Sequence, residues 1–183
     1  MADAPYMGEN TDILLGQEFL TWLWYRSEYA DGLFRSSTND YSFHVRIEHR
    51  LVVRGGEGEQ QETASVSGAF SPMREARLGL STGKKVVRAL VSFVKDDMNW
   101  QLSLKAEDFS LNSFKTPAFA KPEDSEIDED ATFYIKMQFI TEGLELFDEV
   151  YEQFLQIRLS ENAWADEVKS INEWINHDIT KGA

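Results

Sequence analysis

The stretch GQEFLTWLWYRSE, residues 16–28, is the segment from which the fold is best predicted. At 3.6 residues per turn its large side chains do not keep to one stripe, because Leu20 and Trp24 widen the face that Phe19 and Trp22 share. A helix with apolar side chains around most of its circumference is normally buried on more than one side. The segment therefore predicts a helix packed against more than one neighbouring element.

Two kinds of neighbour could cover this aromatic helix, and the sequence leaves both open. The protein's own sheet could bury it completely. Alternatively, the helix is partly core and partly a contact surface for a second copy or for a separately encoded protein partner. In that case Phe19, Trp22 and Trp24 are the predicted contact residues, and the protein is a homo-oligomer or part of a complex.

A long strand is predicted over residues 41–56, YSFHVRIEHRLVVRGG, where the two faces of the strand differ in polarity. Tyr41, Phe43 and Val45 begin the more apolar face, and the polar face alternates with it residue by residue. Strict alternation over this length is typical of a β-strand with one face buried. A glycine-rich loop and a return strand over residues 63–70 complete a hairpin.

The rest of the chain predicts further helices and strands, and the whole predicts an α+β fold: an antiparallel β-sheet with helices packed on it. We expect a flexible N-terminus over residues 1–14, one domain over 15–160, and a C-terminal helix over 161–183 packed on that domain. Residues 132–140 fit either a strand or the first turns of a helix. The remaining expected elements are a helix over 71–81 that ends at Gly83, strands over 84–94 and 100–105, an acidic loop over 121–130, a core helix over 144–159, and a last helix whose stripe Trp164, Val168, Ile171 and Ile175 packs inward.

The charge of the 183-residue chain is strongly negative but uneven. The net charge is −14, whereas residues 71–121 alone carry 9 basic and 5 acidic side chains. The whole argues against loose coating of nucleic acid or of an anionic membrane, yet a local field decides what one surface binds. No apolar stretch reaches the roughly 20 residues that span a bilayer. With no cysteine and no signal-peptide pattern, we expect a cytoplasmic protein.

No stretch carries a catalytic or metal-binding signature. GLSTGKK, residues 79–85, resembles a phosphate-binding loop but is one residue too short between its glycines and lacks the Ser or Thr after the lysine. His44 and His49 are five positions apart on the predicted strand, so they point to opposite faces and cannot share a metal. The acidic run over 123–130 lacks the pattern of a calcium loop. We therefore expect no enzyme activity, no metal and no cofactor.

Basic side chains recur on the predicted strands. Arg46, Arg50 and Arg54 share one face of the long strand, Lys84 and Arg88 share a face of the later strand, and Lys105 stands on the hairpin partner of that strand. The pattern fits an ordinary solvated sheet face. The alternative is a shallow basic surface that meets phosphates without reading bases.

From Gly83 onward the chain resembles the C-terminal part of the RdgC family, the recombination-associated bacterial proteins. The residues that carry the resemblance are GKKVVRALVSF (83–93), WQLSLKAEDFSLNSFK (100–115) with its LNSFK turn, PEDSEIDEDATF (122–133), YIKMQFITEGLELFDEVYEQFL (134–155) and IRLSENAW (157–164). Upstream, LLGQEFLTWLWYRSE is similar to a segment of longer, divergent RdgC-like proteins. The motifs consist of pattern and spacing, with no catalytic signature among them.

The resemblance implies a non-enzymatic accessory protein of recombination or replication. Members of the family bind duplex DNA with little sequence preference, as a dimeric ring with a basic lining, and restrain recombinase-driven strand exchange. Lys84, Lys85 and Arg88 lie in the matching strand region. Such a protein would be associated with the nucleoid. The alternative is an acidic interaction or assembly subunit that has an RdgC-like fold and does not bind DNA, which the net charge and the short chain favour.

Overall fold

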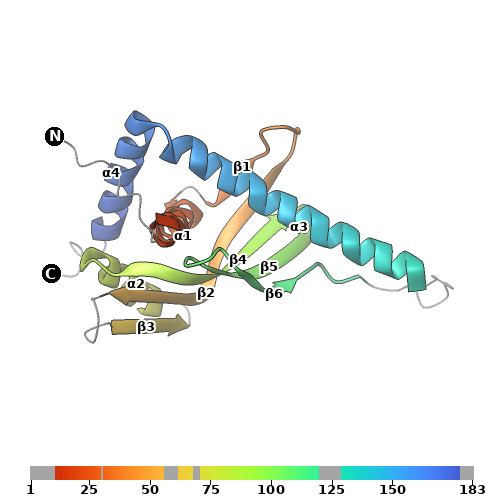
Figure 1. Cartoon of the computed structure of the whole chain (residues 1–183), viewed down its shortest axis with the longest axis horizontal. Helices are drawn as coiled ribbons and strands as arrows, with labels where there is room; N and C mark the ends of the chain where they lie inside the picture. Colours follow the sequence, from red (N-terminus) through yellow and green to blue (C-terminus); the bar gives the residue numbers. More distant parts are fainter. Residues whose placement is uncertain (1–10, 30, 56–61, 68–70, 120–128, 178–183) are drawn as a thin grey trace.

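The fold is an antiparallel β-sheet with helices packed on it, as the sequence predicts (Figure 1). The structure is a computed structural model that describes residues 11–29, 31–55, 62–67, 71–119 and 129–177. The helices are α1 (Thr11–Tyr29), α2 (Ser71–Ser81), α3 (Glu129–Arg158) and α4 (Glu161–His177). The strands are β1 (Leu33–Arg35), β2 (Ser42–Gly55), β3 (Glu62–Ser67), β4 (Lys85–Lys95), β5 (Met98–Lys105) and β6 (Leu111–Lys115).

The sheet is built around the long strand β2. Its strands run in the order β1-β2-β4-β5-β6, and β3 pairs with the same edge of β2 as β1 does. The register places β1 against the first residues of β2 and β3 against its last residues, from Leu33↔His44 to Gly55↔Glu62. The predicted strands of the 41–56, 63–70, 84–94 and 100–105 segments are confirmed within the described residues. No sequence pattern predicts β1, and LNSFK forms strand β6 where a turn is expected.

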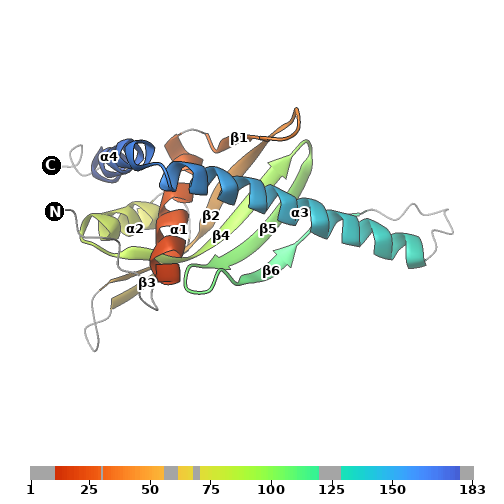
Figure 2. The ribbon, with the colours of Figure 1, turned by 45° about the horizontal axis from the view of Figure 1, so that its top comes forward.

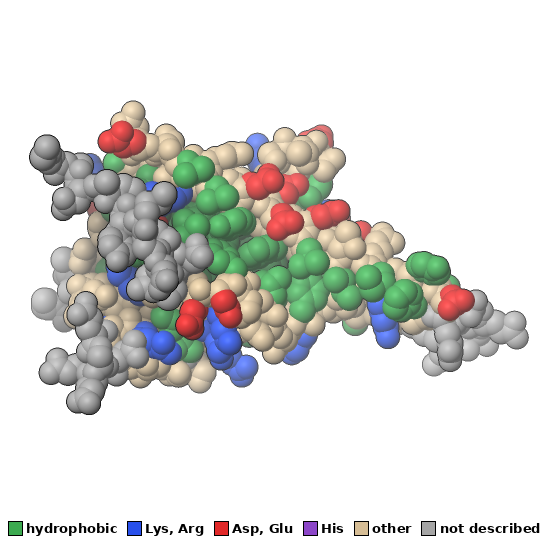
Figure 3. Space-filling model, in the orientation of Figure 1, with side chains coloured by type: hydrophobic (Ala, Val, Ile, Leu, Met, Phe, Trp, Pro, Cys, Tyr) green, Lys and Arg blue, Asp and Glu red, His purple; other side chains and the backbone are tan. Residues whose placement is uncertain are grey.

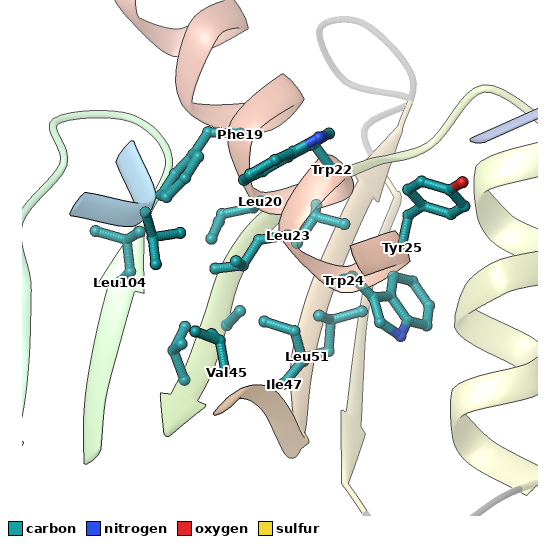
Figure 4. Packing of buried hydrophobic residues seen from close by; sticks show 14 of the residues in the cluster. Phe19, Leu20, Trp22, Leu23, Trp24, Tyr25, Val45, Ile47, Leu51 and Leu104 are labelled. Carbon is teal, nitrogen blue, oxygen red and sulfur yellow. The ribbon is translucent and has the colours of Figure 1, made fainter. Parts of the chain in front are cut away.

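Helix α1 lies at the centre of the molecule, against one face of the sheet (Figure 2). Leu20 and Leu23 point to the strands, where Val45 and Leu51 lie (Figure 4). The other sides of α1 are covered by α3 and α4, through ring contacts such as Phe19 with Tyr151 at 5.2 Å and Trp24 with Trp174 at 5.1 Å. Every large side chain from Phe19 to Tyr25 is buried.

The predicted partner contacts of α1 are therefore wrong. Phe19, Trp22 and Trp24 are each 0% exposed within the single chain, so none of them offers a surface to a second protein. The reason is that α3 and α4 approach α1 from sides that the sheet leaves open. The aromatic side chains of this helix are thus covered by other elements of the same chain and not by a partner protein.

Carboxylates accept hydrogen bonds from three buried tryptophans, whereas Trp100 Nε1 donates to the backbone oxygen of Phe139 at 2.7 Å. Trp22 Nε1 donates to Glu167 at 2.7 Å. Glu28 accepts from Trp24 Nε1 at 2.6 Å, from Trp174 Nε1 at 3.1 Å and from Arg77 Nη2 at 2.9 Å. Since these donors come from α1, α4 and α2, one carboxylate ties three helices together.

Helix α3 is longer and less buried than predicted. It continues without a break through residues 132–140, so this ambiguous segment is helical. The prediction that the 144–159 part lies in the core holds for part of its circumference: Leu146, Val150 and Phe154 are buried, whereas Leu144 is 39% and Leu159 80% exposed. The physical reason is that α3 packs on the sheet and on α1 with one side only.

Near both ends of the chain, the observed structure differs slightly from the prediction. α1 begins at Thr11, so residues 11–14 are helical, and residues 1–10 lie outside the described residues. In α4 the predicted inward stripe holds for Ile171 and Ile175, and Trp174 joins them, whereas Val168 is 36% exposed. The acidic loop prediction falls mostly on residues 120–128, outside the described residues.

The carboxylate that joins the three helices gives a first prediction. Glu28→Ala should lower the free energy of unfolding by roughly 1–2 kcal/mol, because two buried indole N–H groups lose their acceptor. Glu173→Ala, which removes an exposed carboxylate from α4, is the control and should stay within about 0.5 kcal/mol of the wild type. Urea unfolding followed by tryptophan fluorescence measures both. Equal midpoints for the two variants would contradict the role of Glu28.

A second prediction concerns the contact of α1 with the end of β5. A Cβ at Gly16 would collide with the backbone carbonyl oxygen of Ala106. Gly16→Ala should therefore destabilise by about 2 kcal/mol, although alanine favours a helix by about 1 kcal/mol. Gly79→Ala on α2 is the matched control, because its nearest neighbour is the flexible side chain of Lys84 at 3.3 Å. The same urea titration should find the control variant as stable as the wild type or slightly more so.

Candidate nucleic-acid interface

A β-bulge in β4 decides which cations share a face. Val53 pairs with Val86 but Val52 pairs with Arg88, so Val87 is an extra residue between them. A bulge of one residue reverses the alternation of side chains beyond it. Without it Arg88 would point into the core with Val86; with it Arg88 is exposed, and the next residue, Ala89, is 0% exposed.

Three of the predicted cations meet at one hollow. Arg88 of β4 is the direct cross-strand partner of Lys105 of β5, and Val52 of β2 lies opposite Arg88 on its other side. Arg54 lies two residues beyond Val52, and it lines the same hollow, whose volume is about 450 Å³. We call Arg54, Arg88 and Lys105 the cationic triad. The remaining lining residues are Gln17, Val52, Ser65, Val87, Ala106 and Glu107.

The carboxylates near the cationic triad leave it positively charged. Within the described part of the chain, no triad side chain makes an ion pair, and Glu107 is the acidic residue among those that line the hollow. The next residue, Asp108, accepts a hydrogen bond from the backbone N–H of Ser110 at 2.9 Å. The side-chain and backbone hydrogen bonds of Ser110, with a smaller contribution from the charge of Lys105, hold the pKa of Asp108 below its usual range.

The other four predicted cations are not part of this hollow. Lys84 pairs with Glu62 at 3.0 Å. Lys85 lies opposite Arg54 in the register, but both lysines line a separate depression beside α1 and α4. Because the bulge reverses the alternation, the prediction that Lys84 and Arg88 share a face is wrong.

Arg46 and Arg50 are also separated from the triad. Both are exposed, but Arg46 lines a different hollow, beside His44 and α2, and Arg50 lies where β2 pairs with β3. On β4 the neighbour of Arg46 is Ser92, whose Oγ donates to Glu48 at 2.6 Å. The carboxylate of Glu48 is thus anchored on β2 between Arg46 and the triad, so the three arginines of this strand do not line one hollow.

The histidines and carboxylates do not assemble a metal site in the residues that the structure describes. His44 Nδ1 lies 3.2 Å from the backbone oxygen of Asp31, and the side chain of His49 falls outside the description. Sequence reasoning missed Gln17, Ser65 and Glu107 as lining residues of the hollow, because they come from segments whose meeting depends on tertiary packing.

Charge is unevenly distributed over the face drawn in Figure 3. Most blue side chains lie along the lower margin, with some red ones beside them, and further red side chains line the upper side of α3. A local positive field can therefore exist on a protein of charge −14.

Among the described helices, none combines the length and the apolar character that crossing a membrane requires. No family model, curated protein or solved structure matches the chain.

The like charges of the triad predict a stability effect. Like charges directly opposite each other on neighbouring strands are destabilising, so Lys105→Gln should raise the free energy of unfolding by about 0.3–0.5 kcal/mol in low salt. The gain should vanish in 1 M salt, where charges are screened over about 3 Å. Lys115→Gln is the control, because its cross-strand partner Gln101 is uncharged. An equal effect in both variants would show that the triad residues do not repel each other.

Proposed function

We propose that this protein is a non-enzymatic, weakly sequence-specific duplex DNA-binding accessory protein of recombination or replication, as the resemblance to the RdgC family implies. The observation that supports the proposal is the cationic triad: three cations from three neighbouring strands at one hollow, without an ion pair in the described residues. Such a protein would act in the cytoplasm, in association with the nucleoid.

The chemistry of the triad suits phosphate contacts. Guanidinium and ammonium groups bind phosphate oxygens through charge-assisted hydrogen bonds, and such contacts position a protein on DNA without reading its sequence. Three phosphate contacts give a slope of about −2.7 in a plot of log affinity against log salt. Affinity should therefore fall roughly 40-fold between 50 and 200 mM salt.

Removal of the triad tests the proposal. The variant Arg54→Gln/Arg88→Gln/Lys105→Gln should lose at least about tenfold in affinity for every duplex sequence, and the remaining binding should show a flatter salt dependence. The measurement is fluorescence anisotropy of labelled duplexes at 50 and 200 mM salt.

Two controls separate the triad from charge in general. Arg35→Gln/Lys136→Gln/Lys169→Gln removes the same charge from exposed positions on β1, α3 and α4 and should bind within about twofold of the wild type. Lys84→Ala should also bind normally, because Lys84 is neutralised by Glu62. If the triad variant binds like the wild type, or if the charge control loses as much, the proposed interface is wrong.

A second function is favoured by a different observation. Apolar side chains of α3 remain exposed, with Phe133 at 59% and Met137 at 44%. Exposed apolar surface rimmed by charge is typical of a protein-protein contact. The protein is then an interaction or assembly subunit, and absence of duplex binding at 50 mM salt would leave this function as the better supported one.

A further inference from the structure

Helix α3 extends well beyond the sheet that supports it (Figures 1 and 2). Along one side of the helix runs a row of apolar residues with alternating spacings of four and three, which we call the α3 stripe. Its members are Phe133, Met137, Ile140, Leu144, Phe147 and Tyr151. This spacing is the repeat by which two helices pack along their length.

The two halves of the α3 stripe differ in what covers them. Phe147 and Tyr151 pack against Phe19 of α1, with ring centroids 6.0 and 5.2 Å apart. At the other half, Phe133 is 59%, Met137 44% and Leu144 39% exposed. The described chain covers these three side chains only in part. The sheet first contacts α3 near Phe139, through Trp100, so Phe133 and Met137 precede the supported part of the helix.

The charges of α3 leave the stripe accessible to an equally acidic molecule. At 100° per residue, Glu142, Glu145 and Glu149 lie on the side of the helix away from the stripe, whereas Asp130 and Asp148 flank one edge of it. Figure 3 shows red side chains on the upper side of α3 and green ones along its lower side. Two such helices can therefore meet stripe to stripe while their acidic sides point outward.

We propose that the exposed half of the α3 stripe binds the same half of a second copy of this chain, with the two helices antiparallel. The pairing places Phe133 opposite Leu144 of the second copy and Met137 opposite its Ile140. Antiparallel packing directs the two sheets to opposite ends of the helix pair, so the projecting ends overlap without collision of the domains. This inference rests on the second function proposed above and is independent of DNA binding.

The size of the patch sets the strength of the association. Three side chains that are about half exposed supply less than the roughly 800 Å² per partner of a standard interface. The dimer should therefore be reversible and dependent on concentration. Since each copy carries a charge of −14, added salt screens the repulsion and should strengthen the dimer, whereas it weakens binding to DNA.

The first experiment is sedimentation equilibrium of the wild type over a wide range of concentrations. We expect a monomer-dimer equilibrium whose dissociation constant rises about tenfold or more in Phe133→Ser/Met137→Ser. Both side chains are exposed, so the double variant should unfold at the same urea concentration as the wild type. The matched control is Leu78→Ser, which removes a 50% exposed apolar side chain from α2 and should leave the dimer unchanged.

The second experiment tests the orientation of the two α3 helices in the dimer. Because the chain contains no cysteine, each introduced cysteine is the only thiol in its variant. Phe133→Cys and Leu144→Cys are purified separately, mixed and oxidised. The mixture should form a disulfide-linked dimer, because the two positions face each other in the antiparallel pair. Phe133→Cys alone should not, since its two copies lie about 16 Å apart along the helix axis and a disulfide needs Cα atoms within about 7 Å.

The outcomes separate this inference from the proposed DNA function. A strict monomer at every concentration and salt, or cross-linking of Phe133→Cys alone as fast as of the mixture, overturns the antiparallel dimer. Loss of the dimer in Phe133→Ser/Met137→Ser with unchanged duplex affinity supports it and leaves the DNA interface intact. A wild type that dimerises but shows no duplex binding refutes the DNA proposal alone.

Discussion

Helix α1 has large apolar side chains on several sides, and the sheet, α3 and α4 must all pack against it to remove them from water. Removal of a large apolar side chain from water contributes about 1.5–3 kcal/mol to the free energy of unfolding. From Phe19 to Tyr25 this helix buries six such side chains, and Thr21 is the remaining residue of the segment. A helix with apolar side chains on so many sides cannot be satisfied by one sheet. It needs α3 on one flank and α4 on the other, and their approach fixes the shape of the whole domain.

Each buried tryptophan also requires a hydrogen-bond acceptor for its indole N–H. Glu28 and Glu167 meet this demand for three of the rings. Their carboxylates lie at the joints between helices, so the same acidic residues that lower the net charge also fix the geometry. Part of the negative charge is thus structural, and it says little about what the surface binds.

The candidate site depends on one irregularity of the sheet. The extra residue Val87 turns Arg88 out of the core and towards Lys105, and it thereby creates a cationic hollow on an acidic protein. Helix α3 combines an acidic side with an apolar stripe. The two surfaces differ in chemistry, and their proposed functions predict opposite effects of added salt: weaker contact with phosphates and stronger contact between two copies of the chain.

The local elements and the α+β class could be predicted from the sequence, since periods of two and 3.6 residues reveal β2, α1 and α2. The sequence also identified all three triad residues among seven candidate cations. It could not reveal the bulge at Val87, the anchoring of Glu48 by Ser92, or the burial of Phe19, Trp22 and Trp24 by α3 and α4. Those features are visible only in the tertiary structure. They depend on which distant segments pack together, and local periodicity does not say which segments those are.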